Sequence, residues 1–333
     1  MIYVFGGRGG PSMSALDEHG AVWAFSTTSL AWSLLEPAQG SPTPEPRSYH
    51  TMTATPFPAP ISTPNITNVL LNEAPDPTKD LATPPAENTY GTIFLHAGCL
   101  SSGGRTSDLW SFDIASRTWA QLPSAPEPAR GGTSLTMIRE RLYRFGGFNG
   151  ETEEGGQIDY IDLNLLDQFS DEGGEGLMAV SPRGKWTSIS MTADSAGEGS
   201  TGVRIGPTDR SVAGFVPVST GAGRDYLLMI CGEGQASTAG HAAAGKFLDD
   251  IWSFRPEADT SSDKAGGKSV QGTFKEVKYH VAGSSQVSGD HEKPLGRRGW
   301  FAASEYNEKH VVVWGGIGED NERLGDGWII TVG

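Results

Sequence analysis

The chain has 333 residues, with 40 acidic and 25 basic residues and a formal net charge of −15. This excess of acidic residues argues against nucleic acid and anionic membrane as partners, because both are bound by clusters of Lys and Arg. No apolar run reaches the length of a membrane span, and the N-terminal residues show neither a basic flank nor a cleavage region, so we expect a cytoplasmic protein.

Short apolar runs that end in glycine recur along the chain, beginning at its N-terminal residues. Gly and Pro together make up about a fifth of the sequence, above the usual share of about 12%, which favours short strands and turns over long helices. We predict that the five runs are equivalent strands of one repeated unit. They are IYVFGG (2–7), IFLHAGC (93–99), LYRFGG (142–147), LLMICGE (227–233) and VVVWGG (311–316).

Two further elements follow each of these runs. The first alternates aromatic and polar residues, which predicts a strand with one buried face. Its copies are AVWAFS (21–26), DLWSFD (108–113), QIDYIDL (157–163), DIWSFR (250–255) and DGWIIT (326–331). The second element carries Trp32, Trp119 or Trp186, with Phe274 in that place in the fourth copy. We expect the tryptophans to fill the space between neighbouring sheets.

A proline followed by an arginine begins the remaining element of the unit. Proline suits the turn before a strand because it presets φ and cannot donate to a neighbouring strand. The copies are PEPRSYH (44–50), PEPARGGTS (126–134), PTDRSVAGF (207–215) and PLGRRGWFAA (294–303). Each complete unit therefore has four antiparallel strands. Three stretches interrupt the pattern and are interpreted as loop inserts, at about 56–91, 165–206 and 256–269.

This order of strands, with its glycine pairs and recurrent aromatic residues, resembles the kelch repeat, whose copies of about 50 residues form the blades of a β-propeller. The resemblance covers nearly the whole chain. It implies an all-β fold in which residues 1–333 form a single kelch-type β-propeller domain of four-stranded antiparallel blades, about five in number, with six as the alternative count. We count about 18 strands where five complete blades need 20. This deficit leaves three alternatives open: an open ring, strands supplied by the inserts, or a truncated chain.

In such a sheet the glycine-ended turns and the proline/arginine turns lie at the same end. Guanidinium groups gathered at this rim could hold an anionic group. We therefore predict a ligand-binding rim, with a protein or a small anionic ligand as the partner. The alternative role for these arginines is a structural hydrogen bond within the turn. The predicted rim residues are Arg47, Arg130, Arg210 and Arg298.

The fourth glycine-ended turn carries a second resemblance. Glu233, His241 and the residues up to Trp252 are similar to a segment of the plant nitrile-specifier, epithiospecifier and thiocyanate-forming proteins and of their fungal kelch relatives. That family is Fe(II)-dependent, and its pattern Glu-x-x-x-Asp-x-x-x-His implies that Glu233 and His241 are metal ligands. Ser237 stands where the middle acid belongs. Acids on neighbouring turns could replace it, and the candidates are Glu151, Glu153 and Glu319.

Two functions are compatible with these features. The first is a scaffold that binds a partner through its rim loops without a cofactor. The alternative is an enzyme, an Fe(II)-dependent carbon–sulfur lyase of the nitrile-forming type. Motifs for nucleotide binding, zinc proteases and serine hydrolases are missing from the sequence. The two cysteines, Cys99 and Cys231, lack the neighbouring tyrosines of the copper oxidases that share kelch blades, and we interpret both as buried thiols.

Overall fold

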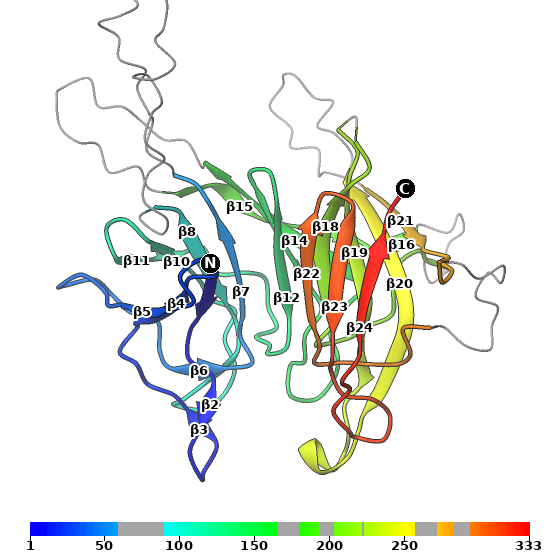
Figure 1. The fold of residues 1–333 in the computed structure, drawn as a ribbon, viewed down its shortest axis with the longest axis horizontal. Helices are drawn as coiled ribbons and strands as arrows, with labels where there is room; N and C mark the ends of the chain where they lie inside the picture. Colours follow the sequence, from blue (N-terminus) through cyan, green and yellow to red (C-terminus); the bar gives the residue numbers. More distant parts are fainter. Residues whose placement is uncertain (59–89, 165–179, 194–202, 222, 257–271, 283–293) are drawn as a thin grey trace, which may run out of the picture.

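The computed structural model describes residues 1–58, 90–164, 180–193, 203–221, 223–256, 272–282 and 294–333. Five antiparallel sheets follow one another as the blades of a β-propeller (Figure 1). Helix is confined, in these residues, to the single 3₁₀ turn η1 (Gly240–Ala242). No helix in the described ranges is both long enough and apolar enough to cross a membrane.

Each sheet is built from one continuous stretch of the chain, and the strand numbers that a sheet skips belong to small ribbons outside it. The first sheet is β1 (Ile2–Val4), β4 (Val22–Phe25) and β5 (Trp32–Leu35). The second is β7 (Thr51–Thr55), β8 (Thr92–His96), β10 (Leu109–Asp113) and β11 (Thr118–Leu122). The third is β12 (Ser134–Ile138), β13 (Arg141–Phe145), β14 (Gln157–Asn164) and β15 (Ser181–Ser190). The fourth is β18 (Gly214–Ser219), β19 (Asp225–Gln235), β20 (Lys246–Pro256) and β21 (Gly272–Glu276).

The fifth sheet is β22 (Ala302–Asn307), β23 (His310–Trp314) and β24 (Gly327–Thr331). Strands β7, β12, β18 and β22 contact one another from sheet to sheet, so these first strands surround the axis of the propeller. Small two-stranded ribbons lie outside the blades. They are β2 (Arg8–Gly9) with β3 (Ser14–Ala15), β6 (Arg47–Ser48) with β9 (Cys99–Leu100), and β16 (Thr192–Ala193) with β17 (Val203–Arg204).

The repeat predicted the strands in their observed order. The glycine-ended runs form β1, β8, β13, β19 and β23, and the proline/arginine elements lead into the first strands of four sheets. Phe274 occupies the fourth strand of its sheet, opposite Phe254, as expected for the residue that replaces tryptophan there. The insert at 56–91 joins β7 to β8, as predicted, and its residues 59–89 lie outside the described residues. Most of the other two inserts also lies outside them.

The core is divided into four hydrophobic clusters, and each cluster lies between two consecutive sheets. Each cluster has members from both of its sheets, for example, in order from the first interface to the fourth, Val22 and Trp119, Leu109 and Leu142, Phe145 and Phe215, and Ile230 and Val313. No cluster of described residues joins the fifth sheet to the first. Within the described ranges the array therefore has five blades and four packed interfaces, the arrangement expected of an open ring. No described part of an insert adds a strand to the first or fifth sheet.

The expectation that every tryptophan packs between sheets is wrong for two of them. Trp119 is buried, but Trp32 in the first sheet is 54% exposed and Trp314 in the fifth is 60% exposed. Both side chains lie on sheets at the ends of the array, on the face turned away from the neighbouring sheet. The sequence places a tryptophan at both positions, but the side chain is buried only where another sheet packs against that face.

Strand β24 offers a direct test of this open arrangement, because adjacent isoleucines lie on its two faces. Ile329 is 67% exposed, whereas Ile330 packs in the cluster between the fourth and fifth sheets. We expect Ile329→Ser to change the free energy of unfolding by less than about 0.5 kcal/mol and Ile330→Ser to lower it by about 2 kcal/mol. Urea denaturation of both variants measures the difference. Equal losses would show that the face of Ile329 is covered.

Candidate functional site

The turns that follow the glycine-ended strands have one backbone shape in all five sheets. The first residue of each pair has φ between +49° and +66°, and the second has φ between +98° and +115°. The first position accepts Ala97 and Cys231, because a left-handed conformation is open to other residues at some cost. The second position is glycine in every copy, since a φ near +100° is rarely adopted by residues with a side chain. The sequence signal that recurs without exception is thus this second glycine.

These turns are joined by hydrogen bonds to the arginine turns of the next sheet. The N–H groups of Gly7, Gly98, Gly147 and Gly232 donate to the carbonyl oxygens of Arg47, Arg130, Arg210 and Arg298, at 2.9–3.0 Å. The two kinds of turn therefore meet at one end of the propeller, as the strand order predicted. We call this end, made of the glycine-ended turns and the arginine turns, the axial loop face.

The side chains of three predicted rim arginines are bound within their own sheets. Each is at most 4% exposed and donates two hydrogen bonds of 2.6–2.9 Å to an aspartate. The same aspartate accepts the indole N–H of the tryptophan two residues later. The sets are Arg47, Asp108 and Trp110; Arg210, Asp250 and Trp252; and Arg298, Asp326 and Trp328. The hydrogen bond from Arg298 lowers the pKa of Asp326 to about 2. A ligand would compete with these carboxylates for the arginines.

The third sheet departs from this pattern, because Gln157 stands where the aspartate recurs. Arg130 donates instead to the carbonyl oxygen of Gly146 at 3.2 Å and lies 3.7 Å from Glu154. Burial and the charge of Arg144 lower the pKa of Arg130 to about 10. The ligand-binding role predicted for the four rim arginines is not tested by these contacts and stays a prediction.

Glu233 is buried near the end of β19, and its backbone N–H and C=O pair with Ser211 at 2.9 Å. Its carboxylate packs against Gly245, where an added Cβ would lie 1.9 Å from Oε1. Burial raises the pKa of Glu233, and a hydrogen bond with the side chain of Trp300 opposes this rise. The backbone of His241 lies in η1, and its side chain is outside the described atoms. The predicted ligand pair is therefore untested.

Of the neighbouring acids considered as an additional ligand, Glu153 approaches Glu233. It lies on the turn between β13 and β14, and neither carboxylate oxygen meets hydrogen-bond geometry with a described group. The pKa of Glu153 is raised to about 8, first by burial and also by the charge of Glu233, while Ser211 and the N–H of Ala236 lower it in part. The other two acids lie elsewhere: Glu319 pairs with Arg297 at 2.8 Å, and Glu151 is exposed. Within the described ranges, no three His, Cys, Asp or Glu side chains are grouped as metal ligands.

Two arginines that the repeat did not single out lie on neighbouring turns of the axial loop face. Arg8 follows β1, donates to the hydroxyl of Tyr49, and lies 5.3 Å from the centre of that ring. Arg105 follows β8 and lies 5.2 Å from the ring centre of Phe148, and its buried Nε has no acceptor among the described residues. Neither arginine has a carboxylate partner within the described part of the chain. A weak signal existed, because an arginine precedes the Asp-x-Trp sequence by three residues at both Arg105 and Arg323.

A chain of backbone hydrogen bonds connects the arginine turns around the axis. Gly132 donates to Tyr49, Val212 to Gly132, and Trp300 to Val212, at 2.8, 2.8 and 3.2 Å. The rings of Tyr49 and Trp300 then meet edge to face, with their centres 5.5 Å apart. The axial loop face thus combines two aromatic rings at the axis with Arg8 beside one of them. Guanidinium groups stacked on rings keep their N–H donors available for an anion.

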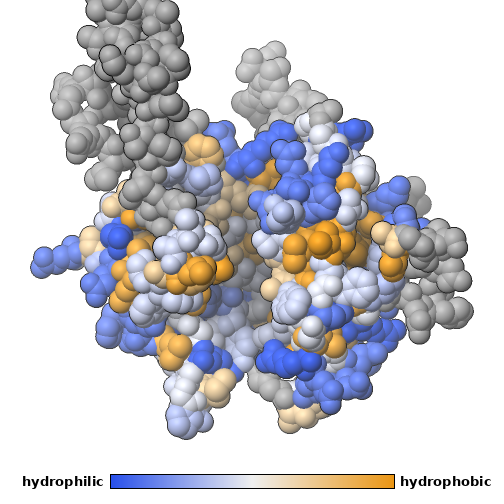
Figure 2. All heavy atoms as spheres, in the orientation of Figure 1, coloured by the Kyte–Doolittle hydropathy of each residue, from blue (hydrophilic) through white to orange (hydrophobic). Residues whose placement is uncertain are grey.

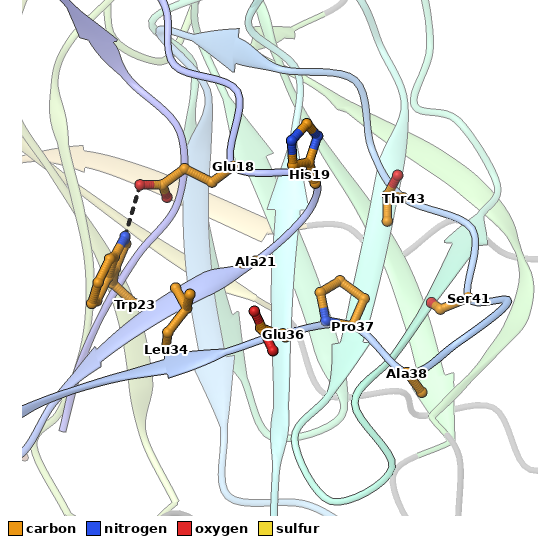
Figure 3. A pocket seen from close by; sticks show the side chains of 10 residues that line it. All are labelled: Glu18, His19, Ala21, Trp23, Leu34, Glu36, Pro37, Ala38, Ser41 and Thr43. Atoms are coloured by element: carbon orange, nitrogen blue, oxygen red, sulfur yellow. Dashed lines mark hydrogen bonds between the residues drawn. The ribbon is translucent and has the colours of Figure 1, made fainter.

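A cavity of about 620 Å³ lies on the first sheet. Figure 3 shows its lining, in which Glu18 accepts the indole N–H of Trp23 at 2.8 Å. The loop that carries Pro37, Ser41 and Thr43 forms its other side (Figure 3). The cavity includes none of the predicted site residues.

Comparison with models of protein families and with curated protein sequences finds no match. Among solved structures, the one described as the structure of YjhT is similar, with a TM-score of 0.55 at 12% sequence identity. The similarity covers 99% of this chain and 78% of that one. At this level of identity the likeness extends to the fold alone, and it agrees with the β-propeller arrangement of the sheets.

Proposed function

We propose that this protein is a kelch-type binding protein whose axial loop face takes a small anionic ligand carrying a carboxylate, phosphate or sulfate group. One observation carries the proposal. Arg8 and Arg105 lie on adjacent turns, each against an aromatic ring, and neither has a carboxylate partner among the described residues. Such arginines offer paired donors to an anion.

The buried Nε of Arg105, which has no acceptor among the described residues, supports a ligand at this place. A buried donor without an acceptor costs free energy, so native proteins usually satisfy it with a protein group, water or ligand. Arg105 also lies in an acidic chain, with 40 acidic residues against 25 basic ones, yet no described acid pairs with it. An anion would supply the missing acceptor.

The distribution of charge over the turns would orient such a ligand. Glu153 and Glu233, on the third and fourth sheets, present no positive charge to an anion, whereas Arg8 and Arg105 lie on the first and second sheets. The anionic group is therefore expected beside the first and second sheets. In this proposal the arginines paired with aspartates maintain the turns, and Arg8 and Arg105 bind the ligand.

The test is isothermal titration of the full chain with inorganic sulfate and with phenyl sulfate at low ionic strength. We expect binding that weakens at least about tenfold in Arg105→Gln, with an intermediate loss in Arg105→Lys, which keeps the charge but not the forked donors. The matched control is Arg117→Gln. Arg117 has no carboxylate partner in the described residues either, but it lies in the turn between β10 and β11, at the opposite end of the sheet.

Equal affinities for the wild type and Arg105→Gln would overturn the proposal, as would the failure of both anions to bind. Binding of an acidic peptide in place of both small anions would point to a protein partner at the same face. The Fe(II)-dependent lyase stays a prediction. Anaerobic binding of Fe(II) that is lost in both His241→Ala and Glu153→Gln would favour it.

A further inference from the structure

The outer face of the first sheet is an uncovered apolar surface. Directly paired residues of antiparallel strands lie on one face, and the pairs Ile2 with Phe25, Phe25 with Trp32, and Val4 with Trp23 place these side chains together. Ile2, Val4 and Trp32 are exposed. The opposite face carries Val22 and Ala24, which are fully buried against the second sheet.

The outer face of the fifth sheet has the same character. Val312 is paired with Ile329, and Trp314 follows two residues after Val312, so the three side chains share a face. Trp314 and Ile329 are exposed, whereas Val311 and Val313 on the other face are buried against the fourth sheet. Figure 2 shows hydrophobic residues on both sides of a hollow that separates the two ends of the array. We call the space between these two outer faces the open slot.

The backbone identifies what is missing from the slot. Four hydrogen bonds join the five successive sheets, each from the second glycine of a turn to the carbonyl oxygen of the arginine in the next sheet. Gly316 is the fifth such glycine, with φ of +107°, and its N–H has no acceptor among the described residues. The fifth sheet therefore presents the same donor as the others, without the arginine turn that receives it.

We propose that a partner polypeptide containing the same type of repeat inserts one four-stranded antiparallel sheet into the open slot. Its two apolar faces would cover the first and fifth sheets, and the carbonyl oxygen at its arginine turn would accept the N–H of Gly316. The inserted sheet would pack on its two neighbours in the same way as the sheets pack at the four interfaces already present. It uses none of the residues proposed to bind the anion, although the turn of Gly316 also belongs to the axial loop face.

A second copy of this chain cannot supply a sheet with two free apolar faces. Each of its terminal sheets has only one free face, because the other face is packed in that copy's own core. Such a sheet could cover one side of the slot and not both.

The test uses the full chain with a photo-crosslinking p-benzoylphenylalanine at position 314 or at position 32, made in the cells that normally produce the protein. Both positions are exposed aromatic sites, so the replacement leaves the core intact, and circular dichroism checks the fold. The control position is Leu30, which is 73% exposed at the tip of the β4–β5 hairpin. Adducts are identified by mass spectrometry.

The expected result is one polypeptide, carrying the proline/arginine turn and the glycine-ended strand, that is crosslinked from both 314 and 32 and not from 30. Adding Ile329→Asp is expected to reduce the yield at position 314 at least about tenfold, because a buried charge at the interface is costly. Crosslinking to a second copy of the chain, capture of a protein without the repeat, or the absence of any adduct would overturn the proposal.

Discussion

Replacing Arg210 with methionine is expected to lower the free energy of unfolding by about 3–5 kcal/mol. The Arg210 side chain is fully buried, and it donates two hydrogen bonds to Asp250 and one to the carbonyl oxygen of Cys231. The variant removes the guanidinium from the Asp250 carboxylate, which keeps the indole N–H of Trp252, and it removes the Arg210 donor from the carbonyl oxygen of Cys231. Urea denaturation at neutral pH, followed by tryptophan fluorescence, measures the loss.

The matched control is Arg297→Met, next to a rim arginine in the sequence but on the surface. Arg297 is 53% exposed and pairs with Asp249 and Glu319, at 3.5 and 2.8 Å. An exposed pair of this kind contributes at most about 1 kcal/mol. If Arg210→Met cost no more than Arg297→Met, the structural role of the arginine turn would be wrong. A smaller loss in the double variant Arg210→Met, Asp250→Leu than in Arg210→Met alone would locate the cost in the unpaired carboxylate.

Gly232→Ala is expected to destabilise the protein by more than about 3 kcal/mol, for two separate reasons. The backbone has φ of +106°, which a residue with a side chain rarely adopts. In addition, the new Cβ would lie 2.8 Å from both the Cβ of Ala213 and the carbonyl oxygen of Ser211. The arginine turn of the fourth sheet would have to shift, although its position is set by the hydrogen bond that the carbonyl oxygen of Arg210 accepts from Gly147. Thermal and urea unfolding both report the loss.

Gly7→Ala separates the two effects. Gly7 holds the same position in the first sheet with φ of +98°, but no heavy atom lies within 4 Å of the Cβ site. This variant carries the backbone strain alone, for which we expect about 1–3 kcal/mol. The close approach accounts for the difference between the two variants. Equal losses would mean that glycine is needed at this position for its backbone only.

The repeat made most of the fold predictable, because each unit repeats the same local signals. Glycine pairs, alternating aromatic residues and proline/arginine turns identified the strands and their order, and even the substitution of Phe274 for tryptophan. The positive φ at the turns also followed from the glycines. What the pattern could not supply was the exposure of Trp314, since burial of its face depends on a neighbouring sheet rather than on its own sequence.

The site was predictable only in part, for a different reason. The arginine and the Asp-x-Trp sequence were each recognised as repeated features, but Arg47 and Asp108 are 61 residues apart and their pairing is a property of the folded sheet. The charge of Glu233 contributes to the raised pKa of Glu153, and the role of either acid as a metal ligand stays a prediction. Arg8 and Arg105 follow the glycine-ended runs, where the amino-acid sequence differs from copy to copy. The repeat therefore did not mark them.

Hydrogen exchange at the second glycine of the five turns distinguishes an open array of sheets from a closed one. The five turns are equivalent, four are joined to a following sheet, and the fifth faces the open slot. For the isolated chain we expect the amides of Gly7, Gly98, Gly147 and Gly232 to exchange at least about a hundredfold more slowly than that of Gly316. Protection of Gly316 equal to that of the other four, or rapid exchange at all five, would contradict the open arrangement.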